Sequence, residues 1–257
     1  MRGLISAFRT LTILPVPGRD AENLANALPF FPIVGAFLGI VVALTAFAIA
    51  HYLDWNVGAG AVGVALAAWL TRALHLDGLA DVADALGAGR TRERRLEIMK
   101  DPHIGTFGVV TVVAALLLKT AAIVKLAALP QPSWIVVPFI VSRTVQVQLA
   151  AALPYARAAG GKGQPFVDNA GAAHLVAAAV VAAVLCFAVA GFGAVLALSI
   201  SLAAAMALSR WMKVNFGGVT GDLLGMASES VETVLFVALA AAGPLLSMTF
   251  KGIGWPP

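Results

Sequence analysis

The chain has 257 residues, of which 60% are hydrophobic and 12% are charged, and its formal net charge is +4. Soluble domains carry roughly 25% charged residues, about twice the fraction found here. Together with the mean hydropathy of +0.92, this low charge excludes a soluble globular enzyme, a disordered chain and a nucleic-acid-binding protein. The one cysteine, Cys186, also excludes a disulfide framework and a cysteine-based zinc site. The composition predicts an all-α, polytopic membrane protein.

Charge-poor stretches long enough to cross a bilayer recur along the chain, since about 20 mostly apolar residues make one span. The predicted spans are 29–50, 56–75, 104–129, 133–153, two within 169–209 that are joined by a turn at Gly191-Phe192-Gly193, and 233–250. Residues 4–18 are expected to form an interfacial segment, and no cleavable signal is expected. The sequence therefore predicts seven transmembrane helices in a single integral membrane domain, 1–257.

Lys and Arg are distributed unevenly between the predicted loops. They occur before the first span and after every second span, whereas the turns at 51–55, 130–132 and 191–193 contain none. Basic residues favour the cytoplasmic side. This alternation predicts a cytoplasmic N-terminus, and it places loops 77–103, 154–168 and 210–232 together on the cytoplasmic face.

The first of these loops contains three aspartates at spacings of four and three, namely Asp77, Asp81 and Asp84. On a helix these positions lie within an arc of roughly 60°. At an effective dielectric constant near 20, each close pair of carboxylates repels by about 3 kcal/mol. A hard cation such as Mg²⁺, held by carboxylates together with substrate phosphates, would relieve this repulsion. The alternative is a solvated acidic turn at a membrane exit.

A second acidic cluster follows a glycine-rich segment, Gly217-Gly218-Val219-Thr220-Gly221. Asp222 and Glu229 are seven residues apart and share a helix face, and Glu232 lies about 60° away. Backbone N–H groups where the helix begins, around Gly218, Thr220 and Gly221, suit phosphate oxygens. The alternative is a flexible connection between two spans.

Basic residues surround both clusters, and most of them are explained equally well as orientation signals. Arg90, Lys100, Arg157, Arg210 and Lys213 belong to this group. Arg143 differs because it lies about ten residues inside an apolar run, where an arginine pairs with a buried carboxylate or holds a phosphate. Lys119 and Lys125 are expected to extend toward the membrane surface. His75 is a candidate general base, although a structural histidine explains it as well.

The string His75-Leu-Asp-Gly-Leu-Ala-Asp-Val-Ala-Asp-Ala-Leu-Gly-Ala-Gly-Arg90 resembles the cobalamin synthase family of adenosylcobinamide-GDP ribazoletransferases. The resemblance covers nearly the whole chain. It continues in Leu11-Thr-Ile-Leu-Pro-Val-Pro17, Phe31-Pro-Ile-Val-Gly35, Arg94-Arg-Leu-Glu-Ile-Met-Lys-Asp101, Ile104-Gly-Thr-Phe-Gly108, Ser142-Arg143, Leu153-Pro-Tyr-Ala-Arg157 and Gly218-Val-Thr-Gly-Asp-Leu-Leu-Gly225.

This resemblance implies an enzyme of the bacterial cytoplasmic membrane that joins α-ribazole, or its 5′-phosphate, to adenosylcobinamide-GDP and releases GMP, with Mg²⁺ as cofactor. It implies that the clustered acids (Asp77, Asp81, Asp84, Asp222 and Glu229) hold the metal. Arg143, Arg157 and Lys100 would neutralise the leaving phosphate, with Arg90 beside them, and Asp84 or His75 would accept the hydroxyl proton. Membrane lipid is the expected surrounding, and a homo-oligomer is compatible with the sequence.

Three other classes of membrane protein are alternatives to this function. Phosphotransferases that join a CDP-activated headgroup to an alcohol also have an Asp-Gly pair and spaced aspartates, but their motif has Ala-Arg next, whereas here Ala80 is followed by Asp81. An ion-coupled transporter would place its acids near the bilayer midplane. A purely structural membrane anchor would leave both acidic clusters unexplained.

Overall fold

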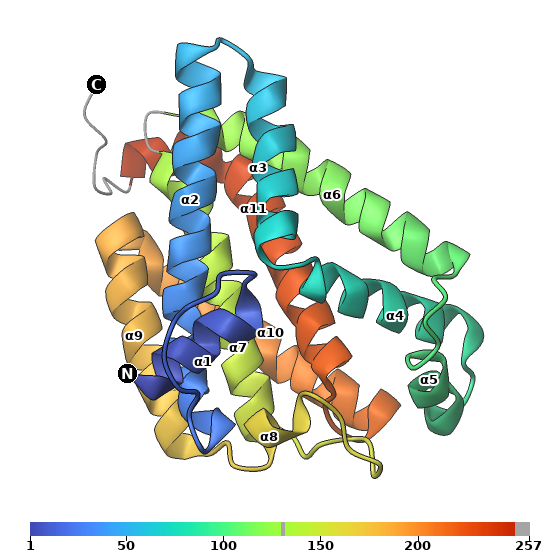
Figure 1. The fold of residues 1–257 in the computed structure, drawn as a ribbon. Coiled ribbons are helices and arrows are strands. Elements are labelled where there is room, and N and C mark those ends of the chain that lie inside the picture. The colour runs from blue at the N-terminus through green and yellow to red at the C-terminus, as the bar shows by residue number, and fades with distance from the viewer. Residues whose placement is uncertain (130–131, 250–257) are drawn as a thin grey trace.

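The computed structural model describes residues 1–129 and 132–249, and within them the regular structure is helical apart from one isolated parallel bridge, Tyr155–Val219 (Figure 1). The elements are α1 (Arg2–Leu11), η1 (Leu24–Phe30), α2 (Phe31–Tyr52), α3 (Asn56–Leu70), α4 (Leu74–Ala88), α5 (Arg92–Ile98), α6 (Thr106–Ala127), η2 (Pro132–Ile135), α7 (Val136–Ala152), α8 (Gln164–Val167), α9 (Ala172–Ala190), α10 (Gly193–Phe216) and α11 (Gly221–Thr249).

Six helical segments within these residues are long and apolar enough to cross a membrane, and the bent pair α3–α4 makes a seventh if it counts as one span. The prediction of an all-α polytopic membrane protein is therefore confirmed. The turn predicted at Gly191-Phe192-Gly193 separates α9 from α10, and Gly191 has a φ of 54°. Residue 250 of the last predicted span and residues 130–131 of a predicted turn lie outside the described residues.

The second predicted span, 56–75, ends earlier than expected. Helix α3 stops at Leu70, and the chain then bends by 90° into α4. Arg72 and Ala73 at the corner have left-handed φ values of 53° and 52°. The Arg72 guanidinium donates hydrogen bonds to the backbone oxygens of Arg9 (2.9 Å) and Thr12 (3.0 Å), so the N-terminal segment holds the corner in place.

The segment predicted as a loop over 210–232 is helical except at residues 217–220. Helix α10 continues to Phe216 and ends at Gly217, whose φ of 75° suits a residue without a β-carbon. Helix α11 begins at Gly221, which confirms the helix start predicted just before Asp222. Both helices thus extend from their apolar spans into the polar segment that the sequence predicted as a loop.

Helix α7 lies in the centre of the bundle and packs against α2, α9, α10 and α11 (Figure 1). In the span Pro132–Ala152, 83% of the most apolar window is buried, compared with 17% for Ala172–Ala190 in α9. Polar residues on α7, including Ser142, Arg143 and Gln146, are therefore enclosed by protein. Such positions require partners on the neighbouring helices.

Candidate active site

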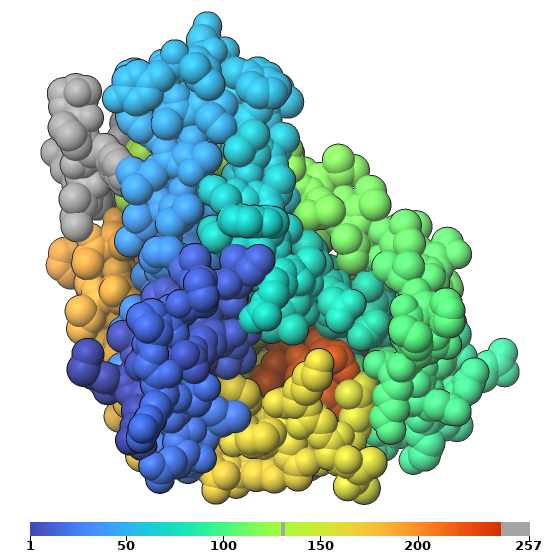
Figure 2. Space-filling model, viewed as in Figure 1, coloured from blue at the N-terminus to red at the C-terminus, as the bar shows by residue number. Residues whose placement is uncertain are grey.

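Helix α4 carries Asp77, Asp81 and Asp84, so the predicted acidic helix face exists. Asp77 is exposed, and the other two are partly buried. Figure 2 shows atoms of α11 at the bottom of a hollow between α4 and the loop of residues 154–168. The hollow thus brings together α4 and α11, which are more than a hundred residues apart in the sequence.

Asp222 reaches this face because α4 and α11 approach closely at Gly78. A β-carbon on Gly78 would lie 2.6 Å from the backbone oxygen of Asp222, which is a clash. The Asp81 carboxylate is repelled by Asp77, Asp84 and Asp222 together. Carboxylates from two distant segments, α4 and the start of α11, therefore lie near one another.

Arg157 is the basic residue that the structure places directly at this cluster. Its Nη2 donates to the Asp222 carboxylate at 2.7 Å and to the Met99 backbone oxygen at 3.3 Å. The two side chains are only 13% and 26% exposed, so the pair is partly shielded from solvent. Tyr155, which the sequence reasoning did not single out, lies beside them, and partial burial raises the pKa of its hydroxyl.

The glycine-rich segment packs against the loop that follows α7. Val219 and the residues around Tyr155 exchange two backbone hydrogen bonds, Ala156 N–H to Val219 O (2.8 Å) and Val219 N–H to Pro154 O (2.9 Å). A β-carbon on Gly218 would lie 2.2 Å from Pro154 O, so this close pairing needs glycine. Thr220 Oγ1 accepts the Leu223 N–H at 3.2 Å in the first turn of α11. Phosphate binding by Gly218, Thr220 and Gly221 stays a prediction.

Asp84 lies on the acidic face and also forms hydrogen bonds to the backbone of a neighbouring helix. Its carboxylate accepts the backbone N–H groups of Gly105 (2.7 Å) and Gly108 (2.8 Å) at the start of α6. Asp84 thus caps α6 from another helix and ties α6 to α4. Arg90 and Lys100 are exposed at the two ends of the segment that contains α5, and their predicted roles stay predictions.

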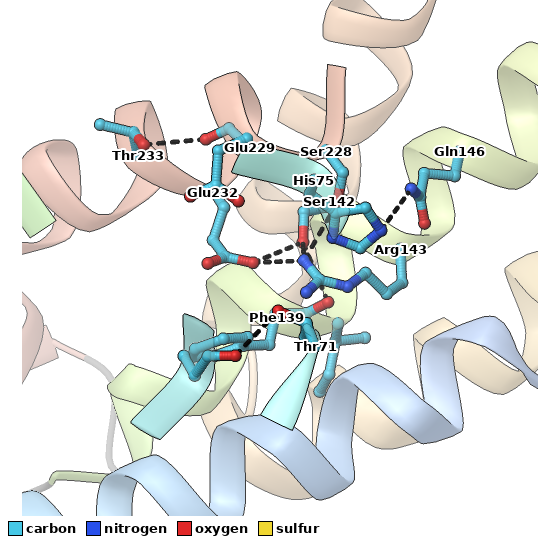
Figure 3. Close-up of polar contacts among 12 residues, drawn as sticks. Thr71, His75, Phe139, Ser142, Arg143, Gln146, Ser228, Glu229, Glu232 and Thr233 are labelled. Atoms are coloured by element: carbon cyan, nitrogen blue, oxygen red, sulfur yellow. Dashed lines mark hydrogen bonds and ion pairs between the residues drawn. The ribbon is translucent and has the colours of Figure 1, made fainter. Parts of the chain in front are cut away.

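Arg143 lies in a buried network rather than on the acidic face (Figure 3). Its Nη1 donates to Ser142 Oγ (2.7 Å) and Ser228 Oγ (3.0 Å), and it forms an ion pair with Glu232. Arg143 and Glu232 are each 2% exposed. Of the two alternatives for an intramembrane arginine, the structure shows the pairing with a buried carboxylate, and phosphate binding by Arg143 stays a prediction.

Lys119 completes this network, and the expectation that it extends to the membrane surface is wrong. It is 5% exposed and pairs with Glu229 and with Glu232 Oε1 (2.6 Å). Both glutamates lie on α11, facing Lys119 of α6, so the ammonium finds carboxylates within the bundle. Lys125, one turn and a half further along α6, is exposed. Asp222 thus pairs with Arg157, whereas Glu229, predicted as its companion, pairs with Lys119.

His75 is buried behind the acidic face. Its Nε2 lies 3.0 Å from Gln146 Nε2 on α7, and Gln146 in turn donates to the Leu224 backbone oxygen at 3.3 Å (Figure 3). His75 Nδ1 has no hydrogen-bond partner in the part of the chain that the structure describes. On α4, His75 and Asp77 are two residues apart and thus point about 200° apart. The histidine therefore faces the bundle interior.

Four of the five predicted metal-binding carboxylates lie at the acidic face, whereas Glu229 is buried against Lys119, so the five do not form a closed ligand set. Within residues 1–129 and 132–249, no three His, Cys, Asp or Glu side chains are close enough to hold a metal ion together. Asp77, Asp81 and Asp222 nevertheless offer hard oxygen donors on one face. Mg²⁺ commonly takes one or two carboxylates and completes its shell with water and substrate phosphates, so the donor chemistry fits this ion.

Comparison with known proteins identifies the family. The model of the cobalamin-5-phosphate synthase family matches residues 3–240. The chain belongs to this family. Two similar relatives are named adenosylcobinamide-GDP ribazoletransferase: one from Chlorobium phaeobacteroides is 43% identical over 93% of this chain and 97% of its own length, and one from Chlorobaculum tepidum is 40% identical over 99% and 98%.

A third relative, from Syntrophobacter fumaroxidans, has the same name and is 38% identical over 93% of this chain and 97% of its own length. No solved structure matches the chain. The family resemblance predicted from the acidic string and its companion motifs is confirmed.

Proposed function

We propose that this protein joins α-ribazole, or its 5′-phosphate, to adenosylcobinamide-GDP. A ribose hydroxyl of the ribazole attacks the phosphorus that is attached to cobinamide; a new P–O bond forms, and the bond from that phosphorus to the GMP oxygen breaks. The hydroxyl proton goes to a base, and GMP leaves. The convergence of Asp222 and Arg157 with the acidic face of α4 carries this proposal, together with the relatives that bear the enzyme's name.

The acidic face is the place where we propose that Mg²⁺ binds, through Asp77, Asp81 and Asp222, with Asp84 beside them. When bound, this ion would neutralise the diphosphate and the charge that develops on the leaving group. Without a cation, four carboxylates around a diphosphate would repel it. Glu229, the fifth predicted ligand, is instead paired with Lys119 inside the bundle.

Arg157 is the residue best placed to bind the phosphate of the departing GMP. Its guanidinium already lies at Asp222, and arginine suits phosphate because of its planar set of donors. Lys100 directly follows Met99, whose backbone oxygen accepts a hydrogen bond from Arg157. Lys100 and Arg90 are both exposed, and their side chains would also bind substrate phosphate. Asp84 is favoured over His75 as the proton acceptor because Asp84 lies on the acidic face.

This chemistry places the acidic end of the bundle in the cytoplasm, where nucleotide-activated substrates are found. We propose accordingly that the protein lies in the bacterial cytoplasmic membrane with its N-terminus inside. The excess of Lys and Arg in the segments at the acidic end supports this orientation.

The proposal is tested with purified protein in micelles, adenosylcobinamide-GDP, Mg²⁺ and either α-ribazole or its 5′-phosphate. We expect GMP release that requires all components, and the faster acceptor identifies the substrate. Asp81→Asn is expected to lower the rate at least about 100-fold. Asp54→Asn is the matched control, because Asp54 is an exposed aspartate in the turn between α2 and α3. Wild-type protein that releases no GMP, or an active Asp81→Asn variant, would refute the proposal.

A further inference from the structure

We infer that Lys119, deep in the membrane-spanning part of α6, is a positioning residue for the acidic face, and that it acts by tying α6 to α11 through Glu229 and Glu232. The inference rests on the proposed function for its activity readout. It concerns a lysine that contacts none of the four aspartates in the hydrogen bonds and ion pairs of the described residues.

The first observation is the balance of buried charge. Two cations, Lys119 and Arg143, meet two carboxylates, Glu229 and Glu232, and none of the four side chains is more than 6% exposed. Glu232 is shared: one oxygen pairs with Lys119 and the other with Arg143. An unpaired charge inside a bundle is far more costly than a paired one. The three helices that carry these residues are therefore fixed at one relative depth.

The second observation is that the N-terminal ends of α6 and α11 both lie at the acidic face of α4. At the start of α6, the N–H groups of Gly105 and Gly108 donate hydrogen bonds to the Asp84 carboxylate of α4. Helix α11 begins beside Asp222, which touches Gly78 of α4. Helices α4, α6 and α11 thus contact one another pairwise, with two junctions at the acidic face.

The network around Lys119 is the third junction of this triangle. Glu229 is seven residues after Asp222 on one continuous helix, which is about 10 Å along its axis. A sliding or tilting of α11 against α6 at Lys119 would therefore be transmitted to Asp222 as a displacement against α4. Misplacement of a reacting group by about 1 Å can cost about 100-fold in rate.

A ligand-binding role for the network is not supported by its size. The cavity lined by Lys119, Arg143, Glu229 and Glu232, together with apolar side chains from α3 and α7, has a volume of about 20 Å³. This is room for about one water molecule. The charges therefore act on one another and on the positions of their helices.

The test compares Lys119→Met and Lys119→Arg with Lys125→Met, the matched control on the exposed side of α6. We expect Lys119→Met to lower kcat for GMP release by about 100-fold and to raise the Mg²⁺ concentration for half-maximal rate. Lys119→Arg is expected to remain within about threefold of wild type, because a cation still faces the buried carboxylates of Glu229 and Glu232. Lys125→Met is expected to behave as wild type.

Because Lys119→Met leaves two carboxylates facing each other and can fail to fold, the double variant Lys119→Met/Glu229→Gln removes one charge of each sign. We expect it to unfold near the wild-type temperature but to keep the altered Mg²⁺ dependence, since the tie between α6 and α11 is absent. A folded double variant with wild-type kcat and Mg²⁺ dependence would overturn the inference, since a purely structural lysine predicts that result.

A second measurement does not depend on activity. Spin labels at Ala88→Cys on α4 and Val234→Cys on α11, both exposed positions, report the distance between these helices in a Cys186→Ser background. The double variant is expected to broaden or shift the distance distribution, and Lys125→Met to leave it unchanged. An unchanged distribution in the double variant would contradict the inference, even if wild-type protein released no GMP and the proposed function failed.

Discussion

Gly78 and Asp222 lie at the closest approach of α4 and α11, with the ideal β-carbon position of Gly78 only 2.6 Å from the Asp222 backbone oxygen. The geometry of the acidic face thus depends on a residue that has no side chain. Replacing the hydrogen of Gly78 with a methyl group must separate the two helices.

We therefore expect Gly78→Ala to lower the rate of GMP release by at least about tenfold and the free energy of unfolding by about 1–3 kcal/mol. Both follow from the clash with backbone atoms, which cannot rotate away. Gly171→Ala is the control, because nothing lies within 4 Å of its β-carbon position. The measurements are GMP release and thermal unfolding in the same detergent. Equal behaviour of the two variants would show that α4 and α11 tolerate separation.

Arg157 is expected to contribute to binding and catalysis through its pair with Asp222. Arg157→Ala should lower kcat/KM by about 100-fold, since it removes a guanidinium from the phosphate site. Because the two residues pair at 2.7 Å, Arg157→Ala and Asp222→Asn should be non-additive in a double-mutant cycle. Arg94→Ala, which breaks a largely exposed pair with Glu97, should change kcat/KM little. Strict additivity of the first two would show that the pair is not coupled during the reaction.

Asp84 combines a capping role with its predicted part in proton transfer, and two variants separate these roles. Asp84→Ala should lower the free energy of unfolding by about 1–2 kcal/mol, because the N–H groups of Gly105 and Gly108 lose their acceptor. Asp84→Asn keeps one acceptor oxygen and should be more stable than Asp84→Ala while still being impaired in GMP release. Full activity of a folded Asp84→Asn would remove Asp84 as the base.

Membrane orientation is checked by labelling of single cysteines in a Cys186→Ser background. Arg94→Cys in α5 should react only with reagent on the cytoplasmic side, and Leu53→Cys, which is exposed in the turn after α2, only with reagent on the opposite side. The measurement is labelling of intact cells compared with inverted vesicles. Labelling of both positions from one side would contradict the proposed topology.

Much of the architecture follows from local sequence, because an apolar stretch of about 20 residues must cross the bilayer whatever its neighbours are. The acidic face of α4 was predictable for a similar reason, since the helical period alone places Asp77, Asp81 and Asp84 together. The start of α11 at Gly221 was likewise marked by the glycines that precede Asp222.

The buried network was not predictable in this way. Lys119 and Glu229 are 110 residues apart, and their pairing depends on which helices are neighbours and at what relative depth they pack. An isolated span suggests that a lysine extends to the surface, whereas a facing carboxylate makes burial favourable. The bend after Leu70 escaped prediction because Arg72 at the corner donates its hydrogen bonds to the backbone oxygens of Arg9 and Thr12, far away in the sequence.

That bend gives the first residues of the chain an unexpected task. The two consecutive left-handed residues, Arg72 and Ala73, cost about 1–3 kcal/mol each. The backbone oxygens of Arg9 and Thr12 offset this cost by accepting hydrogen bonds from the Arg72 guanidinium. The N-terminal segment, which contains no aspartate or glutamate up to Thr12, thereby supports the bend and the direction in which α4, the helix with the three aspartates, leaves it. Deleting the N-terminal segment would therefore disturb the acidic site indirectly, because the bend between α3 and α4 would lose its support.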